Sequence, residues 1–200
     1  MRDWTAHVPI AVLWLAWLAY WAIAARDAKP LERQEPIASR LTHVIPLTIA
    51  AFLLAWTSVP FAALDDRFLP PAPAIQWLGT AMVAAGLAFM AWARVHLGGN
   101  WSGWVALKQS HELIRSGPYG VVRHPIYSGL LLAILGTAIA FGRLRDVLAF
   151  VLMAVAVWRK AGLEESYLMG IFPDSYARYR SEVPGLFPSI LPRRPRSGSS

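Results

Sequence analysis

The sequence predicts an all-α, polytopic membrane protein with about five transmembrane helices, and three observations support this fold class. Hydrophobic residues make up 56% of the 200 residues and charged residues only 16%, whereas about a quarter of the residues of a soluble domain are charged. Apolar blocks without charges recur along the chain, several of them about as long as the roughly 20 residues that a membrane-crossing helix needs. The basic residues lie between these blocks, which is the pattern of a membrane protein.

The composition also excludes other classes of protein. The hydrophobic content is too high for a disordered chain, and the lack of cysteine excludes a disulfide scaffold or a thiolate metal site. The net charge of +7 would suit nucleic acid, but no nucleic-acid partner is expected because the basic residues lie between apolar blocks. The length indicates one domain, residues 1–192. A disordered basic tail, 193–200, follows and can contact anionic membrane lipids.

Five apolar segments account for the expected helices in chain order. The expected spans are residues 8–25, 44–64, 74–93, 126–142 and 147–158. The first is too long and too rich in tryptophan for the core of a signal peptide. The last two are short and are joined by a tight connection, so we expect a helical hairpin. No proline occurs between residue 158 and Pro173, so the fifth helix should continue beyond its apolar part toward Leu168.

The positions of Lys and Arg predict the orientation. With five spans, the N-terminus and the second and fourth loops share one side and carry 4 basic residues, while the other side carries 15. The positive-inside rule then places the N-terminus outside and the C-terminus in the cytoplasm. Two polar stretches, 94–125 and 159–191, fall on the cytoplasmic side. They should fold against each other, because non-helical backbone at a membrane surface needs hydrogen-bond partners.

Candidate chemistry gathers around the last two spans. The chain has no dinucleotide fingerprint, P-loop, serine-hydrolase elbow or zinc-type histidine pair, and a metal site is not expected. Pro125 fits the first position of the fourth helix, which places His124 at or near the N-cap in an extended conformation. The start of a helix offers N–H donors to a carboxylate or phosphate. Alternatively, His124 and Tyr127 only anchor a span at the interface.

The fifth helix contributes acidic and basic residues to the same region. Lys160 and Glu164 are four residues apart and share a helix face. Glu165 is rotated by about 100°, so the two carboxylates need not do the same job. Acidic residues where a span emerges are costly unless they are paired or wetted. The alternative is a weak surface pair between Lys160 and Glu164.

Small residues give the fourth helix a further feature. Gly129, Ala133, Gly136 and Ala140 form a stripe of small residues on this helix. Such stripes allow helices to approach closely. We interpret the stripe as the close-packing face of the C-terminal hairpin.

Several runs of residues resemble one known family. The run 113–119, the run Arg123-His124-Pro125-Ile126-Tyr127-Ser128-Gly129 and the later Glu164-Glu165-Ser166-Tyr167-Leu168 are similar to the signatures of the isoprenylcysteine carboxyl methyltransferase family. The resemblance covers about half the chain, and we take 94–188 as the catalytic region. Membrane phospholipid N-methyltransferases share the His-Pro-x-Tyr-x-Gly and Glu-Glu elements, so the match indicates the cofactor better than the substrate.

The resemblance implies a cofactor and the residues that bind it. It implies S-adenosylmethionine, converted to S-adenosylhomocysteine, at the cytoplasmic ends of the last two spans and without a metal. The implied cofactor contacts are His111, Glu112, Leu113, Ile114, Tyr119, His124, Pro125, Ile126, Tyr127 and Glu164. Lys160 stands at the substrate-side position where the family often has Arg. Lys offers a point charge instead of a bidentate fork, and Arg159 next to it can compensate.

The expected function is transfer of a methyl group to the polar end of a lipophilic or prenylated substrate at the cytoplasmic membrane face. Carboxyl O-methylation of an isoprenylcysteine-like acceptor is the first choice and needs no general base. N-methylation of a phospholipid ethanolamine is the first alternative, with His124 or Glu165 as candidates to accept the proton. The second alternative is a non-catalytic lipid-binding membrane protein. The intact His124, Tyr127 and Glu164 argue against it.

Overall fold

The computed structural model describes residues 4–27, 31–34, 36–55, 62–98, 106–108 and 113–188. Its α-helices are α1 (Trp4–Ala24), α2 (Ile37–Ala55), α3 (Pro73–Leu97), α4 (Pro125–Phe141), α5 (Leu144–Ile171) and α6 (Pro173–Glu182). Short 3₁₀ helices are η1 (Ala25–Asp27), η2 (Ala62–Asp65) and η4 (Gly117–Gly120), and the strands are β1 (Leu31–Gln34) and β2 (Ala106–Lys108). The predicted all-α class is confirmed, apart from the small antiparallel pair β1–β2.

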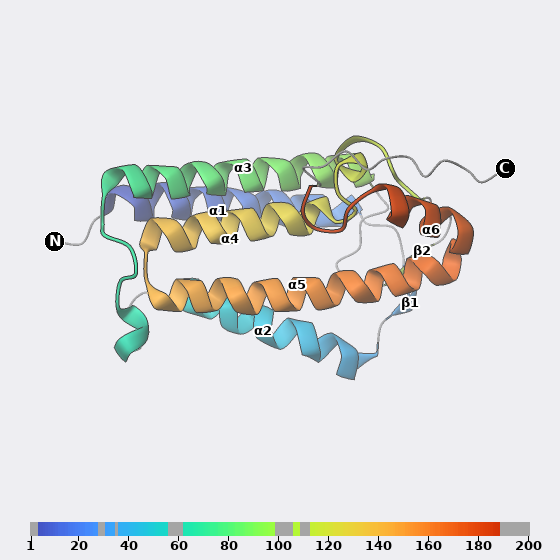
Figure 1. The fold of residues 1–200 in the computed structure, drawn as a ribbon, viewed down its shortest axis with the longest axis horizontal. Coiled ribbons are helices and arrows are strands. Elements are labelled where there is room, and N and C mark those ends of the chain that lie inside the picture. The colour runs from blue at the N-terminus through green and yellow to red at the C-terminus, as the bar shows by residue number, and fades with distance from the viewer. Residues whose placement is uncertain are drawn as a thin grey trace.

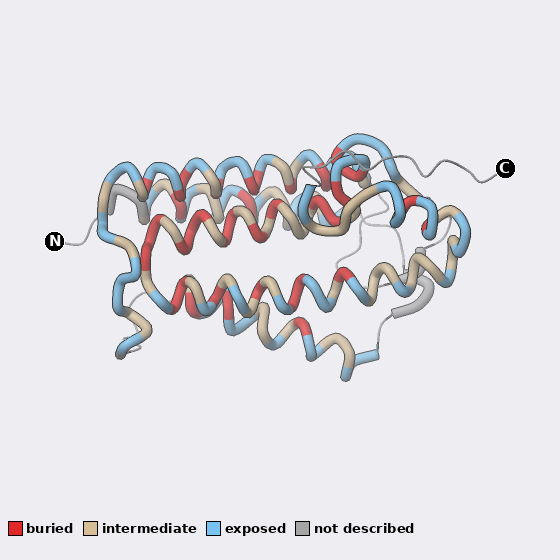
Figure 2. Tube along the Cα trace, in the orientation of Figure 1, coloured by how far each residue is buried: buried red, intermediate tan, exposed pale blue. Residues whose placement is uncertain are grey.

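The five long helices run side by side and alternate in direction along the chain (Figure 1). Helices α1, α3 and α4 share one hydrophobic core, which includes Ile10, Val83 and Ala133. Helices α2, α4 and α5 share a second core, which includes Leu53 and Ile134. Helix α4 contributes to both cores, and it is buried along much of its length (Figure 2).

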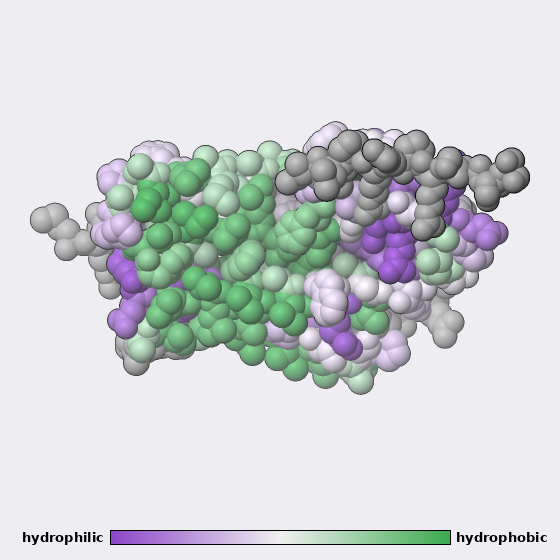
Figure 3. Space-filling model, in the orientation of Figure 1, coloured by the Kyte–Doolittle hydropathy of each residue, from purple (hydrophilic) through white to green (hydrophobic). Residues whose placement is uncertain are grey.

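The outer surface is that of an integral membrane protein. Helices α1, α2 and α3 contain segments long and apolar enough to cross a membrane, and α4 is apolar but shorter, among the residues that the structure describes. A broad apolar surface covers the middle of the face seen in Figure 3, and polar residues gather toward its two ends. Helix α5 has 28 residues and is therefore about 42 Å long, but it carries charges near both ends. The count of five spans stays a prediction.

The helix bounds agree with the expected spans to within a few residues, except in α2 and at the end of α5. This helix begins at Ile37 and ends at Ala55, whereas the expected span was 44–64, and Ala62–Asp65 form a separate 3₁₀ helix. The polar residues before position 44 suggested a loop, but they have partners on the folded protein. His43 is buried, and the Thr42 hydroxyl accepts a hydrogen bond of 2.6 Å from Arg159 Nε. Helix α5 continues past residue 158, as predicted.

The stripe of small residues on α4 packs against α3, so its assignment to the hairpin is wrong. A Cβ atom added to Gly86 would lie 2.5 Å from the carbonyl oxygen of Gly129, and one added to Gly136 would lie 2.6 Å from that of Gly79. These four glycines pair across the two helices at a spacing of seven residues on each. The two backbones can approach this closely only because no side chain separates them.

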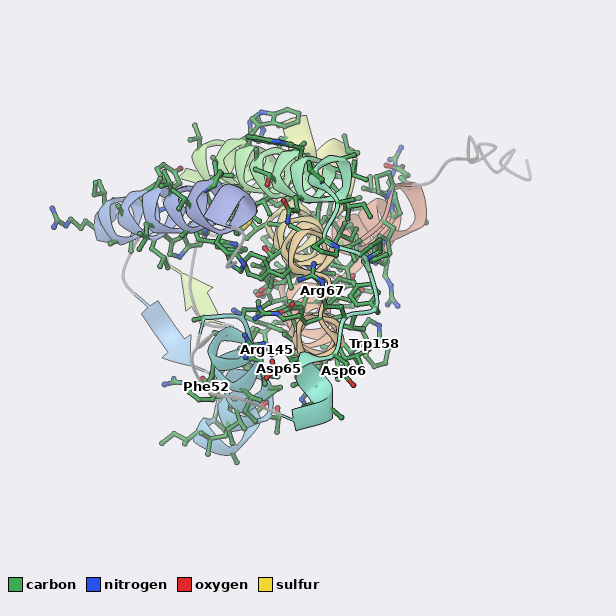
Figure 4. The ribbon with its side chains drawn as sticks, turned by 90° about the vertical axis from the view of Figure 1, so that its left-hand side faces the viewer. Phe52, Asp65, Asp66, Arg67, Arg145 and Trp158 are labelled. Carbon is green, nitrogen blue, oxygen red and sulfur yellow. The ribbon has the colours of Figure 1, made fainter. Side chains whose placement is uncertain are left out.

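The connection between α4 and α5 is held at the end opposite to α6. Gly142 ends α4 in the left-handed conformation (φ 67°), which glycine adopts without strain. The Arg143 guanidinium and Asp146 carboxylate then cap α5, with 2.9 Å between Nε and Oδ2. Arg145 Nε lies 3.2 Å from Asp65 Oδ1, and both side chains are labelled at this end of the molecule in Figure 4. These contacts fix the hairpin to the segment before α3.

Candidate active site

The start of α4 forms one wall of the candidate site. Pro125 is the first residue of α4 and His124 is its N-cap, as predicted, although the His124 backbone (φ −123°, ψ 61°) is not fully extended. The backbone N–H groups of Arg123 and His124 donate to the carbonyls of Pro184 (2.8 Å) and Gly185 (3.1 Å). The two polar stretches therefore fold against each other, as expected, and the segment after α6 covers the start of α4 (Figure 1).

Two neighbouring carboxylates of α5 approach His124 from opposite sides of its ring. The Tyr127 hydroxyl donates to Glu164 Oε1, and Glu164 Oε2 lies 3.5 Å from His124 Nδ1. Glu165 Oε1 lies 3.1 Å from His124 Nε2 and accepts a 2.6 Å hydrogen bond from Arg123 Nη2. Each ring nitrogen of His124 thus faces a carboxylate, and the ring stacks on Tyr127 with 5.6 Å between centroids.

His124, Glu164 and Glu165, with their neighbours Arg123, Tyr127 and Lys160, form a charged cluster. The groups of this cluster shift one another's pKa values so that the charged form of each titrating group is favoured. Burial alone would lower the pKa of His124, but the hydrogen bonds and charges of Glu164 and Glu165 outweigh it and raise the pKa above 6.5. Burial alone would raise the pKa of Glu164, but His124 and the Lys160 charge lower it below 4.5. Burial is likewise outweighed at Glu165, where His124 and Arg123 lower the pKa to about 2. The cluster therefore favours a cationic His124 between two charged carboxylates.

The two basic residues proposed for the substrate side point to different places. Lys160 lies one helical turn before Glu164, and its Nζ is 5.6 Å from the centroid of the Tyr127 ring, within cation–π range. Arg159 is exposed, and its Nε donates to Thr42 Oγ1 on α2. The structure thus brings Lys160 to the cluster, whereas Arg159 is engaged with α2.

The segment before α4 brings Tyr119 to the same end of the bundle. Tyr119 is buried in η4, and its carbonyl oxygen accepts a 2.6 Å hydrogen bond from the Tyr179 hydroxyl of α6. Burial, followed by the charge of Glu164, raises the pKa of the Tyr119 hydroxyl. Leu113 and Ile114 are half-buried in the stretch that leads into η4, and Ile126 is half-buried in the first turn of α4. His111 and Glu112 lie outside the described residues.

The structure adds two arginines that the sequence did not assign to the site. Arg123 binds Glu165 with two nitrogens, and Arg180 Nε of α6 lies 3.4 Å from Glu165 Oε2. Arg123 could have been suspected because it directly precedes His124. Arg180 gave no signal in the sequence, because its partner depends on how α6 folds back.

The donors and acceptors of the cluster fit S-adenosylmethionine. The Glu164 side chain is anionic and 25% exposed, so it can pair with an amino group or offset a sulfonium charge. The start of α4 suits a carboxylate. Among the described residues, no group of three or more His, Cys, Asp or Glu side chains could hold a metal ion.

Comparison with known proteins shows the family to which the chain belongs. The family model of the phospholipid methyltransferases matches residues 74–175, about half of the chain. The chain therefore belongs to this family. The matched range includes the whole of η4, α4 and α5, and with them the residues His124, Tyr127, Lys160 and Glu164.

Curated relatives confirm the resemblance to the isoprenylcysteine carboxyl methyltransferases. The chain is 38% identical over 104 residues to protein-S-isoprenylcysteine O-methyltransferase of Schizosaccharomyces pombe, covering 49% of this chain and 43% of the relative. It is 31% identical over 159 residues to the Mus musculus protein of the same name, covering 75% and 54%. It is also 32% identical to the cobalt-zinc-cadmium resistance protein CzcN of Cupriavidus metallidurans, covering 71% and 61%. The chain thus spans about half the length of the first two relatives.

Proposed function

We propose that the protein is an S-adenosylmethionine-dependent methyltransferase that methylates the carboxylate of an isoprenylcysteine-like, lipophilic or prenylated acceptor at the cytoplasmic membrane face. The main observation is the grouping of Tyr127, His124 and Glu164 where α4 begins and α5 leaves the apolar part of the bundle. The names of the relatives support the carboxyl acceptor.

The cluster would bind and orient the cofactor, which supplies an electrophilic methyl group when bound. Glu164 is held by the Tyr127 hydroxyl on one oxygen and lies near His124 on the other. It would pair with the amino group of the cofactor or offset its positive charge. The start of α4 would receive the cofactor's carboxylate. In such an in-line displacement, the protein chiefly aligns the donor and acceptor and excludes water.

The charge around the site favours a carboxylate acceptor over an amine. An amine must lose a proton, but both nitrogens of His124 face carboxylates, so the ring has no lone pair directed at an acceptor. A carboxylate acceptor needs no general base. Lys160 places a cation beside Tyr127, where it would attract a carboxylate and repel a protonated amine.

N-methylation of a phospholipid amine is the second candidate. It is favoured by the family model, which is that of the phospholipid methyltransferases. In that case Glu165 or water would have to accept the proton, and the adjacent Lys160 would oppose binding of a protonated amine.

Binding and transfer measurements on the purified full-length protein test the proposal. The wild type should bind S-adenosylmethionine without added metal and transfer a labelled methyl group to farnesylated N-acetylcysteine but not to phosphatidylethanolamine. Transfer to phosphatidylethanolamine alone would establish the second candidate instead. Failure to bind the cofactor would overturn both and leave a non-catalytic lipid-binding protein.

A single substitution tests the proposed role of Glu164. Glu164→Gln should weaken cofactor binding about ten- to a hundredfold, because a charge-assisted contact in a partly buried site contributes about 1.5–3 kcal/mol. Glu182→Gln is the matched control, since Glu182 is exposed and pairs with Arg178 of its own helix. Calorimetry showing wild-type affinity for Glu164→Gln would remove Glu164 from the cofactor site.

A further inference from the structure

Glu165 has a set of partners different from that of Glu164. Its side chain is 14% exposed. One oxygen accepts hydrogen bonds from Arg123 Nε (3.0 Å) and Nη2 (2.6 Å) and lies 3.1 Å from His124 Nε2. The other oxygen lies 3.4 Å from Arg180 Nε. Both carboxylate oxygens are therefore directed at cations of the protein.

Arg123, the main partner of Glu165, joins three segments of the chain. Its Nη1 donates to the carbonyl oxygens of Arg180 (3.2 Å) and Val183, and its backbone N–H donates to Pro184 (2.8 Å). These bonds fix the end of α6 and the following residues against the start of α4. The Arg123 side chain is only 10% exposed, and a buried guanidinium without a counter-charge is strongly destabilising. Glu165 supplies that counter-charge.

Glu165 also restricts the His124 ring. With Nε2 directed at Glu165 and Nδ1 at Glu164, both nitrogens must carry protons for both contacts to be favourable. We propose that Glu165 is a positioning residue: it holds His124 and Arg123, and through them keeps Glu164 and the start of α4 in place for the cofactor without touching it. This inference rests on the proposed function, because it assigns Glu164 to the cofactor.

Cofactor affinity at two pH values tests this role. In Glu165→Gln the amide oxygen can still accept from Nε2, but the loss of the charge lets His124 become neutral. Its Nδ1 lone pair would then face Glu164. The substitution leaves the other groups around the ring unchanged, namely Arg123, Tyr127, Lys160, Glu164 and Arg180. We therefore expect Glu165→Gln to bind S-adenosylmethionine within about fivefold of the wild type at pH 6 and at least tenfold more weakly at pH 8.

The ratio of variant to wild-type affinity is the quantity to compare. The amino group of the cofactor titrates in the same range, but it does so equally in both proteins and cancels in the ratio. Glu165→Asp, which keeps the charge, should restore most of the affinity at pH 8, whereas Glu182→Gln should match the wild type at both pH values. A ratio near one at both values would overturn the proposal. So would an equal, large loss at both with an unchanged melting temperature, which would indicate a direct ligand.

Thermal unfolding of the cofactor-free protein separates this inference from the proposed function. Glu165→Gln should lower the melting temperature by several degrees in detergent at pH 7, because Arg123 loses its counter-charge, while Glu182→Gln should not. If the wild type bound no S-adenosylmethionine but this difference were present, the proposed function would fail and the role of Glu165 in holding the segments would stand. An unchanged melting temperature, together with a ratio of variant to wild-type affinity that does not depend on pH, would contradict the positioning role itself.

Discussion

His124 lies between the two carboxylates of the site and contacts both of them. Its two ring nitrogens face Glu165 at 3.1 Å and Glu164 at 3.5 Å, and its side chain is only 6% exposed. A buried imidazole in this position gains from being charged, whereas one in an apolar core would lose its proton. The stability of the site is therefore tied to the protonation of three neighbouring groups.

This linkage predicts that stability is greatest in a mildly acidic window. The pKa of His124 is raised above 6.5 in the folded protein, so its contribution is present below pH 6.5 and is lost as the pH rises through the folded value. The pKa values of Glu164 and Glu165 are lowered from 4.5, so their contribution is present above pH 4.5 and is lost as the pH falls. The melting temperature in detergent should therefore fall on both sides of about pH 4.5–6.5.

Substitution of His124 tests whether this residue causes the loss of stability on the alkaline side of the pH profile. His124→Gln should flatten the decline just above pH 6.5, because that decline comes from the pKa of His124, which is raised in the folded protein. The acid side should persist, weakened, since Arg123 still pairs with Glu165. An unchanged alkaline decline in His124→Gln would show that another group causes it.

The charge of Lys160 should affect a carboxylate acceptor and an amine acceptor in opposite ways. Its Nζ lies 5.6 Å from the Tyr127 ring centroid. Lys160→Met should raise KM for a carboxylate acceptor about tenfold, as expected for a lost charge-assisted contact, with a much smaller effect on cofactor affinity. For a protonated amine acceptor the same change should be neutral or favourable. Steady-state kinetics with both acceptors measures the difference.

Arg159 provides the control next to Lys160 in the sequence. It is exposed and donates to Thr42 of α2, so Arg159→Met should leave KM for the acceptor nearly unchanged. If Arg159→Met raised KM as much as Lys160→Met, the acceptor would be held by both residues. If neither single change nor the double change affected turnover, the carboxylate acceptor would lose its main local support.

At the scale of elements, the pairing of α3 with α4 sets where the site can form. Gly86 faces Gly129 and Gly79 faces Gly136, each with a carbonyl oxygen too close for a Cβ atom. Gly86→Leu should therefore push the two helices apart and lower the unfolding free energy by at least the ~1–3 kcal/mol typical of overpacking. It should also weaken cofactor binding, because Gly129 lies in the first turns of the same helix as His124 and Tyr127. Unfolding in detergent and calorimetry measure the two effects.

Two substitutions of the same kind away from this contact serve as controls. Ala85→Leu adds the same side chain on the exposed face of α3 and should be tolerated. Gly162→Ala, in α5, meets nothing within 4 Å and should stabilise the helix by about 0.5–1 kcal/mol. Equal loss of stability for Gly86→Leu and Ala85→Leu would contradict the close packing of α3 on α4.

The sequence predicted where the helices lie along the chain better than which helices pack against each other. Hydropathy and charge gave the approximate bounds of α1, α3, α4 and α5, and the absence of proline gave the extension of α5. The stripe on α4 was predicted correctly as a close contact, but a period of small residues does not say which helix lies opposite. The start of α2 was missed because Arg40, Thr42 and His43 are polar, and the burial of His43 and the contact of Thr42 with Arg159 of α5 are visible only in the fold.

The site was likewise only partly predictable. The helical rotation of about 100° between Glu164 and Glu165 agrees with the different partners of the two carboxylates, and His124 was correctly placed at the start of α4. Arg180 and the carbonyls of residues 183–185 enter the site only because α6 turns back toward α4. The carbonyl contacts join residues about 60 positions apart, for which local patterns carry no information.

At the scale of the whole molecule, the alternation of the five long helices fixes which segments share a side. Helices α1, α3 and α5 run in one direction and α2 and α4 in the other (Figure 1). The segment between η2 and α3 therefore lies at one end, and α6 with the candidate site lies at the other. Because the site's end carries most of the basic residues in the sequence, the positive-inside rule predicts that it is cytoplasmic.

Single cysteines test this orientation cleanly, because the chain contains no cysteine of its own. Asp66→Cys places a thiol on an exposed residue before α3, and Arg178→Cys places one on α6, where the side chain is 77% exposed. In sealed inside-out vesicles, whose outer face is the cytoplasmic one, a membrane-impermeant maleimide should label Arg178→Cys at once and Asp66→Cys only after detergent is added. Right-side-out vesicles should give the opposite pattern. Labelling of both from the same side would mean that α5 does not cross the membrane together with the other helices. Reversal of the pattern would place the site outside, where a cytoplasmic methyl donor could not reach it.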